Sequence, residues 1–126
     1  MVTTHEEFVD LAPNIVRRRL VVECIHKNNF DEKKIYDYMV NLSKVMNMTI
    51  VTMPVTNYVQ EYGFSAYMSW KESGMHVYTW NNDQNNNRPN FMSIDIYTCK
   101  NFEIKDVIDF TRLTFSEEIT DITWRE

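Results

Sequence analysis

Three segments between Gly63 and Cys99 alternate apolar and polar residues, a pattern that indicates strands with one buried face. They span residues 63–71, 75–80 and 91–99. A tight turn at Ser73-Gly74 joins the first two, and a polar, asparagine-rich loop over 81–90 precedes the third. Connections this short leave no room for the crossovers that parallel strands need, so the sequence predicts antiparallel pairing.

The alternation divides the side chains of these strands between two faces. One face is mainly apolar and carries Phe64, Ala66, Met68, Trp70, Met92, Ile94 and Ile96. The other is largely polar and carries Ser65, Tyr67, Ser69, Lys71, Ser93, Asp95, Tyr97 and Cys99, while His76, Tyr78 and Trp80 share one face of their own strand. We expect the apolar face to form the core and the polar face to meet solvent, a ligand or a second subunit.

Two segments repeat apolar residues at steps of three and four, which predicts amphipathic helices. The first follows Asp31, a plausible N-cap, and the second runs near 103–115. Their apolar stripes are Ile35, Tyr38, Met39, Leu42, Val45 and Met46, and then Ile104, Val107, Ile108 and Phe115. A short third helix is expected over 3–11, because Thr3 and Glu6 have capping-box spacing.

Further strands are predicted from β-branched runs. They cover residues 20–26, 49–55 and 119–124. The resulting order predicts an α+β two-layer sandwich, with one mainly antiparallel sheet and two main helices on one face. A length of 126 residues favours a single domain, with 1–17 as an N-terminal extension and 18–126 as the core.

Charge and cysteine content narrow the function. The net charge is −5 and the only basic cluster is Arg17-Arg18-Arg19, so no basic stripe for nucleic acid is present. No apolar run is long enough for a membrane span, and no signal-type segment opens the sequence, which favours a cytoplasmic protein. Cys24 and Cys99 lack metal-ligand spacing and are expected to be reduced.

Several short motifs in this chain occur in a fixed order. They are Glu23 at the end of the opening strand, Gly63-Phe64-Ser65, Glu72-Ser73, Thr79-Trp80 and Asp95-Ile96-Tyr97-Thr98-Cys99. In this order and spacing, from about Leu20 to Arg125, the sequence resembles the small, prokaryotic type of S-adenosylmethionine decarboxylase.

The resemblance implies a self-processing enzyme. Ser73 would attack the carbonyl of Glu72, the chain would break there, and Ser73 would become a pyruvoyl group that serves as the cofactor, with no metal. Cys99 would protonate the product as a general acid, and Ser65 would assist processing. The implied substrate is S-adenosylmethionine or a related amino acid, the implied pathway is polyamine (spermidine) synthesis, and the implied assembly is a homodimer.

Some positions depart from the pattern of that family. Tyr78 and Gly74 stand where the family has histidines, and Val59 stands where an aromatic residue is expected. A phenol is a poor base at neutral pH, because it loses its proton only near pH 10. His76 shares a face with Tyr78 and is a candidate replacement base.

Two functions therefore remain open: a pyruvoyl-dependent decarboxylase, or a catalytically silent homologue that binds a ligand or regulates a partner subunit. Each candidate residue also has an ordinary structural role, such as a hairpin turn at Ser73 or a strand end at Cys99.

Overall fold

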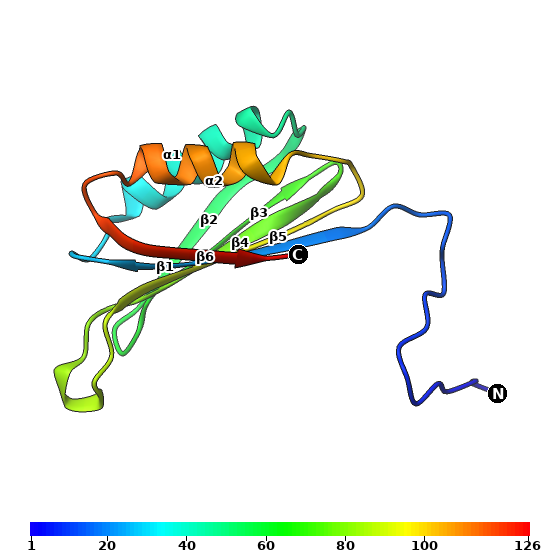
Figure 1. The fold of residues 1–126 in the computed structure, drawn as a ribbon, viewed down its shortest axis with the longest axis horizontal. Coiled ribbons are helices and arrows are strands. Elements are labelled where there is room, and N and C mark those ends of the chain that lie inside the picture. Colours follow the sequence, from blue (N-terminus) through cyan, green and yellow to red (C-terminus); the bar gives the residue numbers. More distant parts are fainter.

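Two helices cover one face of a single six-stranded antiparallel sheet in the computed structural model, which describes residues 1–126 (Figure 1). The strand order across the sheet is β2-β3-β4-β5-β1-β6. The elements are β1 (Arg18–His26), α1 (Glu32–Val45), β2 (Ile50–Val59), β3 (Gly63–Trp70), β4 (Ser73–Trp80), β5 (Asn90–Thr98), α2 (Ile104–Thr114) and β6 (Ile119–Arg125). The predicted α+β two-layer sandwich, with both helices on one face, is confirmed.

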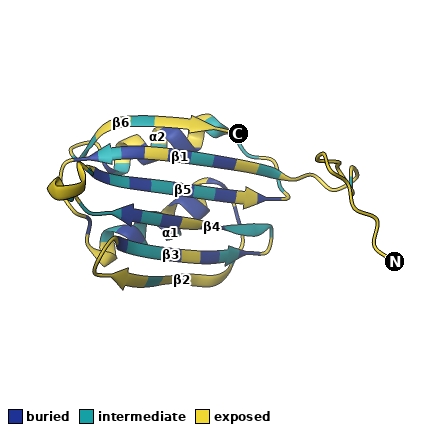
Figure 2. Cartoon of the chain, turned by 90° about the horizontal axis from the view of Figure 1, so that it is seen from below, coloured by how far each residue is buried: buried dark blue, intermediate teal, exposed yellow.

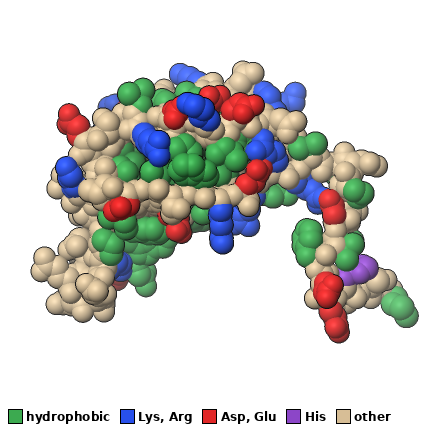
Figure 3. Space-filling view, in the orientation of Figure 1, with side chains coloured by type: hydrophobic (Ala, Val, Ile, Leu, Met, Phe, Trp, Pro, Cys, Tyr) green, Lys and Arg blue, Asp and Glu red, His purple; other side chains and the backbone are tan.

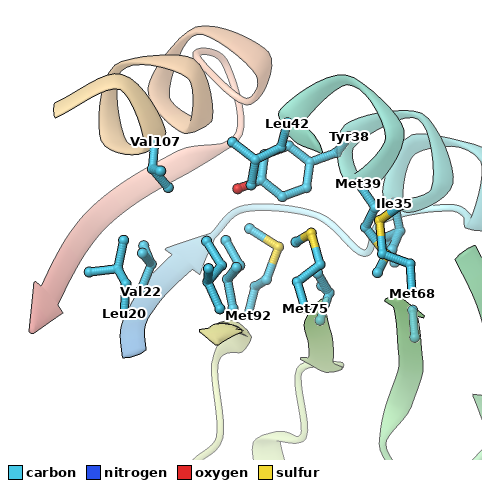
Figure 4. Close-up of a cluster of buried hydrophobic side chains, with 14 of the residues drawn as sticks. Leu20, Val22, Ile35, Tyr38, Met39, Leu42, Met68, Met75, Met92 and Val107 are labelled. Atoms are coloured by element: carbon cyan, nitrogen blue, oxygen red, sulfur yellow. The ribbon is translucent and has the colours of Figure 1, made fainter. Parts of the chain in front are cut away.

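The core lies between the helices and the apolar face of the sheet (Figure 4). The cap of α1 is as predicted, because the Asp31 carboxylate accepts a hydrogen bond of 2.7 Å from the Lys34 amide. Tyr38 on α1 is fully buried, and its hydroxyl lies 2.7 Å from the hydroxyl of Thr111 on α2. This bond satisfies both polar groups at the contact between the helices.

The turn between β3 and β4 lies two residues earlier than the sequence predicted. Lys71 and Glu72 form the turn, and Ser73 already belongs to β4, where it pairs with Trp70 and with Thr98 of β5. Gly74 is needed inside the strand, because a Cβ there would lie 2.5 Å from the carbonyl oxygen of Met68. The glycine permits close approach of two strands rather than a turn.

The helix expected over 3–11 is wrong. Residues before β1 form an extended arm that leaves the end of the sheet (Figures 1 and 2). A capping box alone does not stabilise nine residues, because isolated short helices are marginal in water and this segment packs on no core. The side chains of Phe8 and Leu11 are exposed along the arm.

The sheet face opposite the helices is uncovered, and Figure 2 views the molecule from that side. We call it the open face. Its exposed or half-buried side chains include Arg19, Val21, Glu23, Ser65, Tyr67, His76, Tyr78, Trp80, Phe91, Ser93, Asp95 and Tyr97. Aromatic and histidine rings follow one another across it, with centroids 5.3–6.2 Å apart, in the order Tyr67, His76, Tyr78, Trp80, Phe91.

Candidate active site

The peptide between Glu72 and Ser73 is held in place by Thr49, which directly precedes β2. The Glu72 carboxylate accepts hydrogen bonds of 2.8 Å from the Thr49 amide and 3.1 Å from the Thr49 hydroxyl. The Thr49 carbonyl in turn accepts a bond of 2.8 Å from the Lys71 amide. We call these contacts the Thr49 clamp, and they fix the turn that carries the candidate cleavage point.

The clamp also acts on the charge of Glu72. The hydrogen bond from the Thr49 amide, with smaller contributions from the Thr49 hydroxyl and the Lys100 charge, holds the pKa of the Glu72 carboxyl below its usual value. Glu72 is therefore ionised at neutral pH, and its two carboxylate oxygens each accept one of these bonds.

A second element fixes the carbonyl group of the same peptide. The backbone amide of Cys99 donates a hydrogen bond of 2.9 Å to the carbonyl oxygen of Glu72. An amide donor in this position polarises the carbonyl and would stabilise negative charge on its oxygen during acyl transfer. The exposed Cys99 thiol belongs to the same residue, so the structure brings Glu72, Ser73 and Cys99 together.

Ser73 has an unusual backbone conformation. Its φ of 130° lies in the region that favours glycine, and only Asn47 and Asn87 share a positive φ among the other non-glycine residues. Such conformations are strained and persist only where neighbouring contacts hold them. At Ser73 these contacts are the strand pairs on both sides and the fixed carbonyl of Glu72.

Ser65 and Tyr78 form a separate group. They are direct neighbours on β3 and β4, and Tyr78 also pairs with Ser93 on β5. Both line a pocket of about 380 Å³ that opens at the far end of the sheet from Ser73. The other lining residues are mostly apolar or aromatic: Val59, Tyr62, Gly63, Phe64, Thr79 and Trp80.

The two groups lie apart within one chain. Tyr78 follows Ser73 by five residues on an extended strand, which places their backbones roughly 16 Å apart at the usual strand rise. Tyr78 and Ser65 therefore cannot reach Ser73 of the same chain. The sequence predicted all of these site residues, but the structure divides them into a serine-cysteine end and a serine-tyrosine end.

His76 lies between these two ends on the open face. Its ring stacks on Tyr78 at 5.8 Å with an angle of 5° between the planes, and its cross-strand neighbours are Tyr67 and Asp95. Arg19 donates two hydrogen bonds, of 3.0 and 2.6 Å, to the Asp95 carboxylate, and these bonds raise the pKa of the arginine. A pocket of about 320 Å³ is lined by Arg19, Ser73, Gly74, His76, Asp95 and Tyr97.

Two contributors were missed by reasoning from the sequence. The Thr49 clamp joins residues 23 positions apart, and no spacing rule indicates it. The Arg19–Asp95 pair was missed because Arg19 was considered only as part of the basic cluster Arg17-Arg18-Arg19. No group of three or more histidine, cysteine, aspartate or glutamate side chains is arranged to hold a metal ion, and no helix is long and apolar enough to cross a membrane.

Fold and site together define a class: a two-layer α+β domain with an uncovered sheet face and a serine beside an amide-bonded carbonyl. The family model described as S-adenosylmethionine decarboxylase matches residues 20–124, and the chain belongs to that family. A comparison with curated proteins gave no match. The match covers every strand and both helices at least in part, and it leaves out the N-terminal arm.

Proposed function

We propose that the chain is a cytoplasmic, self-processing decarboxylase of S-adenosylmethionine that serves polyamine (spermidine) synthesis, with a pyruvoyl group made from Ser73. One observation carries the proposal. The Glu72–Ser73 peptide combines a carbonyl oxygen bonded to the Cys99 amide with a strained serine backbone. Membership of the family supports the reaction class and the substrate.

In the first step the Ser73 hydroxyl attacks the Glu72 carbonyl carbon. Negative charge develops on the oxygen that already accepts the Cys99 amide, which lowers the barrier. The C–N bond then breaks, the Ser73 nitrogen leaves as an amine after taking a proton, and an ester links the two residues. Release of the strained φ at Ser73 favours the same direction.

The second step needs a base for the α-proton of Ser73. Within one chain Tyr78 and Ser65 lie too far away, so we assign this role to the Tyr78–Ser65 pair of a second copy. The open face supports such a homodimer, because its continuous row of rings is exposed to solvent in a single copy and a second copy would bury it. Two copies stacked on this face, with β4 crossing β4 head to tail, bring each Ser73 toward the other copy's Tyr78.

Removal of the α-proton expels the Glu72 carboxylate, and water then displaces ammonia from residue 73. Ser73 contributes every carbon of the resulting pyruvoyl group, and the pocket beside it leaves room for a substrate amine. When formed, this group supplies an electron sink for decarboxylation. Cys99 is exposed and its amide bonds the Glu72 carbonyl, and we assign to its thiol the proton that replaces carbon dioxide on the product.

Intact-protein mass spectrometry of fresh and incubated protein tests this proposal. We expect two fragments, 1–72 and 73–126, with the second lighter than its serine form by the mass of one ammonia. A single uncut mass after long incubation of the full chain, at any protein concentration, would refute self-processing.

A catalytically silent homologue is the second candidate, and one observation favours it. Tyr78, which pairs with Ser65 across the strands, is a phenol, and Gly74 has no space for a side chain, so a histidine stands at neither position. In that case the same fold binds a ligand or regulates a partner subunit. Decarboxylase activity of the purified chain on S-adenosylmethionine, measured as released carbon dioxide, would rule this candidate out.

A further inference from the structure

The sheet ends in two edge strands, β2 on one side and β6 on the other (Figure 2). An edge strand presents backbone groups that can pair with another strand, and proteins usually protect such edges with proline or bulges. The β2 edge is protected in this way. Pro54 lies within it, and its pairing with β3 shifts register between Ile50 and Thr52 and again between Thr52 and Val55.

The edge formed by β6 lacks these protections. The strand contains neither proline nor lysine, and no other strand lies on its outer side. Its pairing with β1 is regular from Asp121 to Arg125, and the one irregularity lies at the start of the strand, between Ile25 and His26 of β1. A regular, uncovered edge of this kind is a template for a further strand.

Two opposite charges on this edge have no charged partner within the chain. Asp121 and Arg125 lie on the open face, opposite Ile25 and Val21 of β1. The Asp121 carboxylate accepts only a bond of 3.2 Å from the adjacent Thr120 hydroxyl, and neither residue takes part in an ion pair. They are four residues apart on an extended strand, about 13 Å, so they cannot pair with each other.

The helix side of the same edge is apolar. Ile122 and Trp124 alternate with the charged positions, and Trp124 is 43% exposed although Arg112 of α2 lies over its ring at 5.8 Å. Apolar side chains gather between α2 and β6 on the side of the molecule that Figure 3 shows. A hollow of about 350 Å³ beside them is lined by Arg112, Ser116, Ile119, Thr120, Asp121 and Ile122.

We propose that β6 pairs antiparallel with β6 of a second copy, about a twofold axis at Thr123. In this register Asp121 lies opposite Arg125 of the second copy, and the axis repeats the pair, so both charges gain partners. On the helix side Ile122 lies opposite Trp124 of the second copy, beside the hollow. An axis at Ile122 would instead place Asp121 opposite Thr123 and leave both charges unpaired.

This edge contact differs from the face-to-face pairing proposed above. A twofold axis at an antiparallel strand pair stands perpendicular to the sheet, so both helix layers lie on one side and both open faces on the other. The two sheets become one continuous sheet, and each open face stays free. The inference therefore does not rest on the proposed function, and both contacts can form together in a tetramer.

Charge exchange in the full-length protein tests the proposal, with sedimentation equilibrium as the measurement. Asp121→Arg and Arg125→Asp each place like charges opposite one another at both symmetric positions. Each should weaken the edge contact by about tenfold or more. A mixture of the two variants restores opposite charges in the mixed pair, so association should return. The matched controls are Asp37→Arg and Lys33→Asp on α1, which carry the same charge changes away from β6 and should leave association unchanged.

A covalent trap measures the register. In a Cys99→Ser background, Thr123→Cys should give a disulfide-linked dimer under mild oxidation, because the two equivalent residues face each other with Cβ atoms about 5 Å apart. Thr120→Cys in the same background lies roughly 20 Å from its counterpart and should not link.

Three results would overturn the edge contact: a wild type that stays monomeric, no recovery of association in the mixture, or no disulfide from Thr123→Cys. None of these measurements depends on chain cleavage. Intact masses of the same samples report cleavage separately, so failure of this inference is distinguished from failure of the proposed chemistry.

Discussion

The Cys99 amide donates a hydrogen bond of 2.9 Å to the Glu72 carbonyl oxygen, and this bond ties the end of β5 to the turn after β3. It places the proposed proton donor and the proposed cleavage point on one rigid contact. If the proposed mechanism holds, any shift of the β5 end should change both chain cleavage and decarboxylation. A preparation with slow cleavage should also show low activity per cleaved chain.

Ser73→Ala should abolish cleavage completely, because the alanine offers no oxygen to attack the Glu72 carbonyl. The measurement is the intact mass over time. Ser69→Ala is the matched control on the neighbouring strand, where Ser69 pairs with Gly74, and it should cleave at the wild-type rate. Cleavage of Ser73→Ala at the same bond would mean that another nucleophile operates.

Thr49→Val removes one of the two bonds from Thr49 to the Glu72 carboxylate and keeps the backbone amide. We expect cleavage about threefold to tenfold slower, because the scissile peptide is held less firmly. Thr49→Ser restores the hydroxyl and should recover most of the cleavage rate. If the loss in Thr49→Val came only from altered packing, the serine variant would not recover it. Equal rates for valine and threonine would show that the amide bond alone is enough.

Tyr78→His should accelerate cleavage, by about tenfold or more, since an imidazole near its own pKa is the better base at neutral pH. The time course of fragment formation measures the effect. Tyr78→Phe should slow or stop cleavage, because its ring stacks in the same way on His76 but cannot accept a proton. If the histidine variant cleaves no faster than the wild type, proton removal by residue 78 is not what limits processing.

His26 predicts a loss of stability in mild acid. Its ring is buried against Phe30, Nδ1 lies 2.6 Å from the Asn28 carbonyl oxygen, and Nε2 has no partner. Burial lowers the pKa of His26 below 6.5, while the backbone groups of Asn28 and Phe91 and the nearby charge of Glu118 oppose the shift. The unfolded chain then takes up a proton first, so stability falls as the pH drops from 6.5 to the lowered folded value.

The size of this effect is at most about 1.4 kcal/mol per pH unit across that window. Urea unfolding at a series of pH values measures the effect. The variant His26→Leu removes the titrating group and keeps an apolar side chain against the Phe30 ring. The variant should lose less stability than the wild type between pH 7 and pH 5.5. Parallel curves for the two proteins would assign the acid sensitivity to other groups.

Period-two alternation and helical stripes were sufficient to predict the layers, because burial is decided residue by residue along each element. The strand β2 was predicted too short. It continues past Pro54 because it is an edge strand, where a missing amide costs little. The turn at Lys71 and Glu72 was displaced because Gly74 serves close strand contact, which a single sequence does not distinguish from a turn.

The site was harder to predict than the fold. Order along the chain predicted Ser65, Ser73, Tyr78 and Cys99 as site residues, but their separation follows from strand register and extended length, which only the assembled sheet fixes. The Thr49 clamp depends on where the chain enters β2 relative to a distant turn. Contacts of this kind have no local signature.

The position of β1 determines what a cut between Glu72 and Ser73 would leave behind. The N-terminal piece would contain β1, β2 and β3, and the C-terminal piece would contain β4, β5 and β6. Yet β1 is inserted between β5 and β6, so the two pieces are interleaved and share three ladders of backbone hydrogen bonds. Cleavage of the chain would therefore not separate the two pieces. Strand pairing would hold them in one sheet, and they would dissociate only when that sheet unfolds.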